Sequence, residues 1–101
     1  LHAAIEELAR LGKPLVIMEN GTGSDDDTHR GAFIRSHVRQ VELARQEGHD
    51  VRGYFVWSLV DNFEWALGYD SHYGLHRYDR RRDLLVPKGS ARIFRRLIEG
   101  G

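Results

Sequence analysis

The stretch that decides the fold is Leu15-Val16-Ile17-Met18-Glu19-Asn20-Gly21. Its first four residues form a short, wholly apolar run, which is typical of a strand buried on both faces of a parallel sheet. Glu19 follows this run directly, and Gly21 begins a segment rich in Gly, Ser and Asp, which is loop composition. The stretch therefore predicts a buried parallel strand with an unusual acid at its end.

Helices are predicted on both sides of this strand. Upstream, apolar residues recur at helical spacing, Gly12 stands where a left-handed C-terminal cap belongs, and Pro14 prevents the helix from continuing. Downstream, Thr28 or Asp27 can cap a second helix, which ends near Gly48. The apolar stripe of this second helix comprises Phe33, Ile34, Val38, Val41 and Ala44.

A second strand, a long loop and a last helix complete the chain. Residues 51–57 read as the strand, and the loop runs from residue 58 to about 79, with room for a short strand at 75–78. Pro87 is expected to open the last helix, and the arginine run 80–82 to form a solvated turn. Strands that alternate with long helices imply βαβ units and a parallel sheet.

The second informative segment is Trp57-Ser58-Leu59-Val60-Asp61-Asn62-Phe63-Glu64-Trp65. Two tryptophans, an acid beside the second and few aliphatic residues make it a poor core segment. Indole rings offer broad apolar faces and an N–H donor, and a carboxylate is a strong acceptor. This combination suits a ligand with C–H faces and a rim of hydroxyl groups, so it indicates a sugar.

The composition excludes several classes of protein. The 101 residues are enough for one small domain, and 15 Lys and Arg balance 15 Asp and Glu, so the charge pattern does not suit nucleic acid or a membrane as partner. Cysteine is absent, the six histidines lack a metal-ligand spacing, and no motif implies a cofactor. The compartment stays open, with the cytoplasm favoured. Because Leu1 lies mid-helix by pattern, we expect a piece of a longer protein.

Both segments resemble motifs of the glycoside hydrolases of family 1, the β-glucosidases and their relatives. Residues 14–21 are similar to the nucleophile motif of that family, and residues 53–65 are similar to its sugar-binding motif. The resemblance covers nearly the whole chain. Further matching positions are Asp27, Arg30, and the segments 71–75 and 87–91.

The resemblance implies an α/β fold, the (β/α)8 barrel, of which residues 1–101 would be the C-terminal segment with the seventh and eighth strands. It also implies a retaining mechanism in which Glu19 is the nucleophile. In the family the acid/base lies in a Thr-x-Asn-Glu-Pro motif on the fourth strand, and this motif does not occur here. Because Glu42, Glu47 and Glu99 lie on predicted helix faces, the acid/base is expected outside this chain.

The same resemblance implies a pocket for the nonreducing sugar. Trp57 would form the platform beneath the sugar, Glu64 would accept hydrogen bonds from two adjacent hydroxyls, and Trp65 would donate its N–H to a third. Tyr73, where the family usually has Phe, would line the same pocket. Since the phospho-glycosidases of the family lack an acid at the position of Glu64, an unphosphorylated substrate is favoured.

Structural roles for the same residues remain open. Trp57 and Tyr54 can be packing residues at a strand end, and Glu64 can be half of an ion pair with an arginine. Asp27 and Arg30 are expected to be structural, as a helix cap and a contact between helix and barrel.

Two functions therefore remain. The first is a retaining β-glycosidase that acts on unphosphorylated O-β-glycosides, whose partner is the remainder of the barrel. The second is a non-catalytic barrel fragment that needs a complementary chain or only binds sugar. Since a complete barrel takes about 250 residues, the isolated chain is expected to be inactive in either case.

Overall fold

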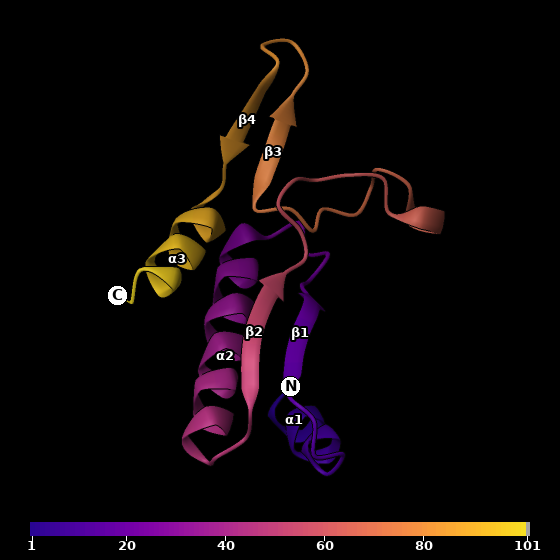
Figure 1. Cartoon of the computed structure of the whole chain (residues 1–101). Helices are drawn as coiled ribbons and strands as arrows, with labels where there is room; N and C mark the ends of the chain where they lie inside the picture. Colours follow the sequence, from indigo (N-terminus) through magenta and orange to yellow (C-terminus); the bar gives the residue numbers. More distant parts are fainter. Residues whose placement is uncertain (101) are drawn as a thin grey trace.

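In a computed structural model of the chain, which describes residues 1–100, helices alternate with strands, as predicted (Figure 1). The elements are α1 (His2–Ala9), β1 (Leu15–Asn20), α2 (Asp27–Gln46), β2 (Val51–Val56), the 3-10 helix η1 (Trp65–Leu67), β3 (His76–Asp79), β4 (Leu84–Pro87) and α3 (Gly89–Ile98). β1 and β2 pair in parallel, with α2 as the crossover, whereas β3 and β4 form an antiparallel hairpin.

The parallel pair brings the carboxyl ends of β1 and β2 to one edge. Leu15 pairs with Val51 at the start of the strands, and beyond their ends the Trp57 N–H donates to the Asn20 carbonyl at 2.8 Å. The approach is close, because a Cβ added at Gly21 would lie only 1.8 Å from the Trp57 carbonyl oxygen. Only glycine therefore fits directly after β1.

Helices cover one face of the parallel pair. The buried core consists of Ile5, Val41, Ala44 and Val51, and Leu1, Leu15, Ile17 and Tyr54 pack against it. On β1, however, Val16 and Met18 are 46% and 68% exposed. The prediction that both faces of this strand are buried is thus wrong for residues 1–100, since no described element lies over the second face.

The N-terminus of α2 is capped by Asp26, so the prediction of Thr28 or Asp27 as the cap is wrong. Asp26 has an extended backbone, and its carboxylate accepts the N–H groups of Thr28 at 2.9 Å and His29 at 3.4 Å. Asp27 is already helical, which turns its carboxylate away from these donors. After the preceding helix, Gly12 has the predicted left-handed backbone with a φ of 67°, but the C-cap of α1 is Arg10, which is right-handed.

The predicted loop after β2 ends in a hairpin, and β4 was missed. Pro87 does not open the last helix; it ends β4, opposite His76, and α3 begins at Gly89. Proline is tolerated there because β4 is an edge strand, where a missing N–H costs no ladder bond. The arginines of residues 80–82 lie in the exposed turn between β3 and β4, as predicted.

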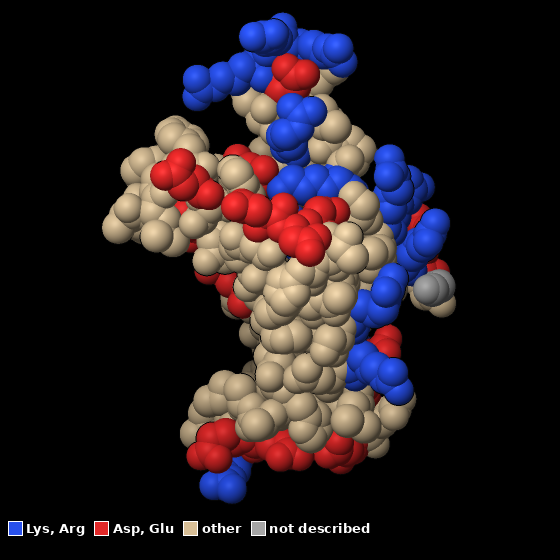
Figure 2. Space-filling model, turned by 180° about the vertical axis from the view of Figure 1, so that it is seen from behind, with Lys and Arg blue, Asp and Glu red and all other residues tan. Residues whose placement is uncertain are grey.

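Charged side chains are unevenly distributed on the surface, and Lys and Arg also line the right-hand side of the view in Figure 2. Lys and Arg side chains gather at the tip of the β3–β4 hairpin, at the top of the view, whereas acidic side chains lie at the opposite end and across the middle. Although the net charge of the chain is zero, the β3–β4 hairpin is therefore basic. Within residues 1–100, none of the helices combines the length and the apolar character that a membrane crossing requires.

We expect Gly21→Ala to destabilise the protein by about 3 kcal/mol, because the added methyl group would overlap the backbone of Trp57. Gly89→Ala is the matched control, since its Cβ would meet nothing closer than Asp27 Oδ2 at 3.4 Å. The control should stay within about 0.5 kcal/mol. Urea unfolding of both variants measures the difference, and equal midpoints would show that the strand ends are not closely packed.

Candidate active site at the carboxyl edge of the parallel strands

Glu19 lies at the carboxyl edge, as the last residue but one of β1. Four residues of β1, from Ile17 to Asn20, are matched by three residues of β2, from Tyr54 to Val56. This irregularity breaks the alternation of faces, so Met18 and Glu19 are both exposed. Within residues 1–100, the Glu19 carboxylate has no hydrogen-bond or ion-pair partner, which leaves both of its oxygens open to a ligand.

Trp57 and Glu64 meet beside this edge. Trp57 follows β2 directly, its peptide bond to Ser58 is cis, and its indole Nε1 donates to Glu64 Oε2 at 3.4 Å. Glu64 is partly buried, and no arginine of residues 1–100 lies within ion-pair distance of it. The structure therefore joins these two predicted site residues, and the alternative of a Glu64–arginine pair is wrong for the described residues.

Tyr73 also reaches the edge, whereas Trp65 does not. A Cβ added at Gly23, in the loop after β1, would lie 2.8 Å from Tyr73 Cε2, so the tyrosine ring rests on this glycine. Trp65 lies in η1, which projects from the body (Figure 1), and its side chain is 86% exposed. Within the described residues, the structure thus leaves Trp65 apart from the other site residues.

Tyr54 connects the packing of β2 to the end of β1. Its hydroxyl donates to Asn20 Oδ1 at 2.7 Å, and its ring packs near that of Phe94, with 6.2 Å between the ring centroids. Burial raises the pKa of Tyr54 to about 12, so the phenol remains a donor. Tyr54 is therefore a packing residue, as one alternative held, and it also fixes the amide next to Glu19.

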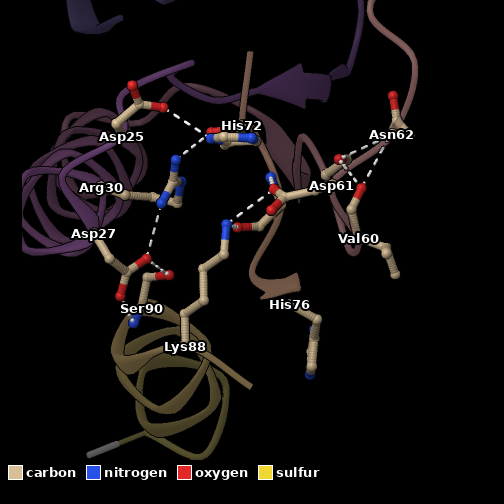
Figure 3. A network of polar contacts seen from close by, with 12 residues as sticks. Asp25, Asp27, Arg30, Val60, Asp61, Asn62, His72, His76, Lys88 and Ser90 are labelled. Atoms are coloured by element: carbon tan, nitrogen blue, oxygen red, sulfur yellow. Dashed lines mark hydrogen bonds and ion pairs between the residues drawn. The ribbon is translucent and has the colours of Figure 1, made fainter. Parts of the chain in front are cut away.

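A buried polar junction beneath the loops is formed by Asp27, Arg30 and Ser90 (Figure 3). Arg30 is 2% exposed and donates to Asp27 Oδ1 at 2.9 Å and to the backbone carbonyls of Ser24 and His72. Asp27 accepts the backbone N–H of Ser90 at 2.8 Å and its hydroxyl at 2.6 Å. Arg30, which was expected to connect helix and barrel, thus also binds two loops. The sequence motif at residues 87–91 includes Ser90 but did not predict Asp27 as its partner.

The pKa of Asp27 is lowered by this junction. Burial by itself raises the pKa of the carboxyl, but hydrogen bonds from Ser90 and Arg30, with the charge of Arg30, outweigh that effect. The folded protein therefore stabilises the ionised form of Asp27.

One group of possible metal ligands lies away from this edge. Ligand atoms of His2, Glu6 and Glu47 fall within 4.8 Å of one another, near the C-terminal end of α2. His2 Nε2 lies 2.8 Å from Glu47 Oε1, so the group satisfies itself as a surface ion pair. We assign no metal to it.

Glu19 lies at the end of one parallel strand, and Trp57 and Glu64 follow the next, at the carboxyl edge where β/α barrels carry their functional residues. The sequence model of Glycosyl hydrolase family 1 matches residues 3–100, and the chain belongs to that family. The beta-galactosidase of Sulfolobus acidocaldarius is 43% identical over 87% of this chain and 18% of its own length. The bifunctional beta-D-glucosidase/beta-D-fucosidase of Bifidobacterium breve is 41% identical over 95% of this chain and 25% of its own.

Solved structures agree. The crystal structure of beta-glycosidase BGL167 superposes with a TM-score of 0.93 at 40% identity, over 98% of this chain and 24% of its own. The beta-glycosidase from the hyperthermophile Thermosphaera aggregans gives a TM-score of 0.91 at 37% identity, over 97% of this chain and 21% of its own. The chain thus spans about a fifth to a quarter of its relatives, and its fold is part of a (β/α)8 barrel.

We expect Asp27→Asn to lower the stability of the protein by about 1–3 kcal/mol at pH 7, because an amide leaves the Ser90 N–H or the Arg30 guanidinium unsatisfied. Because the pKa of Asp27 is lower in the folded protein, its carboxylate stabilises the fold at pH values above the ordinary pKa of 3.8. That stabilisation is lost as the pH falls through the pKa of the folded protein. The difference between the proteins should therefore shrink below pH 3.8. Thermal unfolding at pH 7 and pH 3 measures it, with exposed Asp70→Asn as control; a pH-independent difference would contradict this.

Proposed function

We propose that this chain supplies the nucleophile and part of the sugar pocket of a retaining β-glycosidase that acts on unphosphorylated O-β-glycosides. The observation that carries the proposal is the hydrogen bond from the backbone N–H of Trp57 to the Asn20 carbonyl at 2.8 Å, since it holds the residue after Glu19 against the backbone of Trp57. In parallel β/α barrels this edge is where catalytic groups gather.

Glu19 is the nucleophile of the proposed mechanism. Its carboxylate attacks the anomeric carbon and forms a covalent glycosyl-enzyme, while an acid about 5–5.5 Å away protonates the leaving oxygen. The same acid, now a base, then takes a proton from the water that hydrolyses the intermediate. The glutamates Glu6, Glu7, Glu42, Glu47 and Glu99 lie on helices or directly after them, not at the carboxyl edge. The remainder of the barrel therefore supplies the acid/base, and residues 1–101 form the C-terminal segment of one barrel domain with its seventh and eighth strands.

Trp57 and Glu64 hold the sugar in this proposal. The indole face of Trp57 is the platform, and its N–H orients Glu64, whose remaining lone pairs accept two adjacent sugar hydroxyls. Tyr73 lines the pocket from the loop side. Trp65 donates to a third hydroxyl only once the remainder of the barrel covers η1. The relatives are named as a beta-galactosidase and a beta-D-glucosidase/beta-D-fucosidase, which supports β-glycosides as the substrate class.

We expect Glu19→Ala to abolish turnover, and azide to restore it with an inverted glycosyl azide as product. The assay uses a complete barrel, a chimera in which residues 3–100 replace the matching segment of the Bifidobacterium breve relative. Azide fits the vacated space and attacks from the face that the carboxylate used, without a second inversion. Hydrolysis of aryl β-glycosides and the anomer of the azide product are the measurements.

Glu42→Ala, on the exposed surface of α2, is the matched control for this experiment and should retain activity. The isolated chain should show no turnover, since it lacks the general acid, which contributes about 10²–10⁴-fold. Full activity of the Glu19 variant, or rescue that gives the retained azide, would remove Glu19 from the nucleophile role.

We expect Glu64→Ser in the complete barrel to lower kcat/KM for plain glycosides by at least about a hundredfold. Removing one partner of a buried charged hydrogen bond costs about 2–5 kcal/mol. A phosphate on the hydroxyl farthest from the scissile bond would meet the Glu64 charge, so the variant should also narrow the gap to 6-phosphoglycosides. The kcat/KM ratio for matched plain and 6-phospho aryl glycosides tests this, with exposed Asp70→Ser as control; an unchanged ratio would make Glu64 merely structural.

A further inference from the structure

The loop that carries Glu64 leaves and re-enters the fold through a narrow neck. Backbone hydrogen bonds join its two ends, from the Leu75 N–H to the Ser58 carbonyl at 2.9 Å and from the Asp61 N–H to the His76 carbonyl at 3.0 Å. A third bond runs from the Ser58 N–H to the Tyr73 carbonyl at 3.0 Å, and residues 62–72 lie beyond this neck. The position of Glu64 therefore depends on how firmly the neck is held.

Lys88 holds both sides of the neck with one charged group (Figure 3). Its Nζ donates to Asp61 Oδ1 at 2.9 Å and to the Gly74 carbonyl at 2.8 Å, and the Gly74 N–H donates to the same Asp61 oxygen at 2.8 Å. The side chains of Lys88 and Asp61 are only 17% and 19% exposed. Charged hydrogen bonds shielded from water in this way are stronger than surface pairs.

The neck has little room to adjust around this contact. A Cβ at Gly74 would lie 2.2 Å from the Asp61 N and 2.5 Å from the Val60 carbonyl carbon. The two sides of the neck are therefore in direct backbone contact. If the Lys88 hydrogen bonds were lost, both sides of the neck would move, because closely packed backbones cannot relax at one residue alone.

Lys88 is also tied to the other loop of the site. It is the residue before α3, and its N–H donates to the Leu75 carbonyl at 2.9 Å. Two residues later, Ser90 is held by Asp27, the partner of Arg30. Since Arg30 donates to carbonyls on both site loops, the start of α3 is fastened to both.

We propose that Lys88 is a positioning residue for the sugar pocket: by clamping Asp61 to Gly74 it fixes Glu64 against the Trp57 indole, without touching the substrate. This inference rests on the proposed function. The clamp needs a lysine, because its ammonium satisfies the Asp61 carboxylate and a backbone carbonyl at once. A neutral side chain would leave a shielded carboxylate without its counter-charge.

The test is a double-mutant cycle in the complete barrel, with Lys88→Met, Glu64→Gln and the double variant assayed on an activated aryl β-glycoside. We expect Lys88→Met alone to lower kcat/KM by about ten- to hundredfold, as a displaced binding group does. In the Glu64→Gln background the same change should cost less than about threefold, since the group it positions is already impaired. Equal losses in both backgrounds would overturn the inference, because a general structural role acts alike on both.

Lys13→Met is the matched control, as Lys13 is the other lysine of the chain, is exposed, and should leave kcat/KM unchanged. Lys88→Arg should recover part of the loss, because it retains the charge. If Lys88→Met does not fold, Asp61→Asn carries the same cycle, since it removes the charge but keeps the carbonyl acceptor. Additive losses with Asp61→Asn would equally overturn the inference.

Failure of this inference differs from failure of the proposed function. Activity that survives Glu19→Ala, or that ignores Glu64→Gln, contradicts the function itself. Activity that depends on both glutamates, with additive loss at Lys88, contradicts only the positioning role.

Discussion

The parallel pairing of β1 with β2 is the constraint on which the rest of the site depends. Parallel strands need a crossover, and the 20 residues of α2 supply it on one side of the pair. The pairing brings Asn20 and Trp57 together, so the loops that follow both strands start from one point. Each loop must then return to the helix layer, and both do so near the start of α3.

Burial of Arg30 shows what holds these returning loops. A guanidinium that is 2% exposed is costly unless its donors are bonded, and here the two terminal nitrogens bond one carboxylate and two backbone carbonyls, whereas Nε has no partner within residues 1–100. The carbonyls of Ser24 and His72 lie on different loops and need donors once water is excluded. The planar guanidinium of Arg30, with its fixed geometry, donates to both carbonyls. An apolar residue of similar size would pack there, but it would leave the two loops without a common anchor.

Local patterns predicted the parts of the fold that local chemistry decides. The apolar run at residues 15–18 gave the first strand, and helical spacing gave α2, because each signal lies within the element itself. The strand β4 was missed since its pairing with β3 is a tertiary contact and Pro87 reads as a helix start. The cap of α2 was missed for a different reason. Three consecutive acids, Asp25 to Asp27, are equally able to cap a helix, and only the backbone conformation of Asp26 selects one.

The candidate site divides in the same way. Glu19, Trp57 and Glu64 could be predicted, because an acid or an indole at a strand end is conspicuous and the family resemblance gives each a role. The partners of Lys88 and Ser90 could not be predicted, since a lysine and a serine at the start of a helix are common. Their partners, Asp61 and Asp27, are also distant in sequence.

One face of β1 is exposed, and the strands that would cover it in a complete barrel would also complete the site. Residues 15–18 are apolar throughout, as suits a strand with two covered faces, yet Met18 is 68% exposed. On the same side of the molecule as α3, an apolar groove of about 790 Å³ is lined by residues that include Phe55, Leu59 and Phe94. In a closed barrel, interior side chains fill one face of every strand and neighbouring strands occupy every edge. The strands that would bury Met18 are also the strands whose carboxyl ends would surround Glu19. The packing that this fragment lacks and the acid/base that its proposed chemistry requires therefore have the same source.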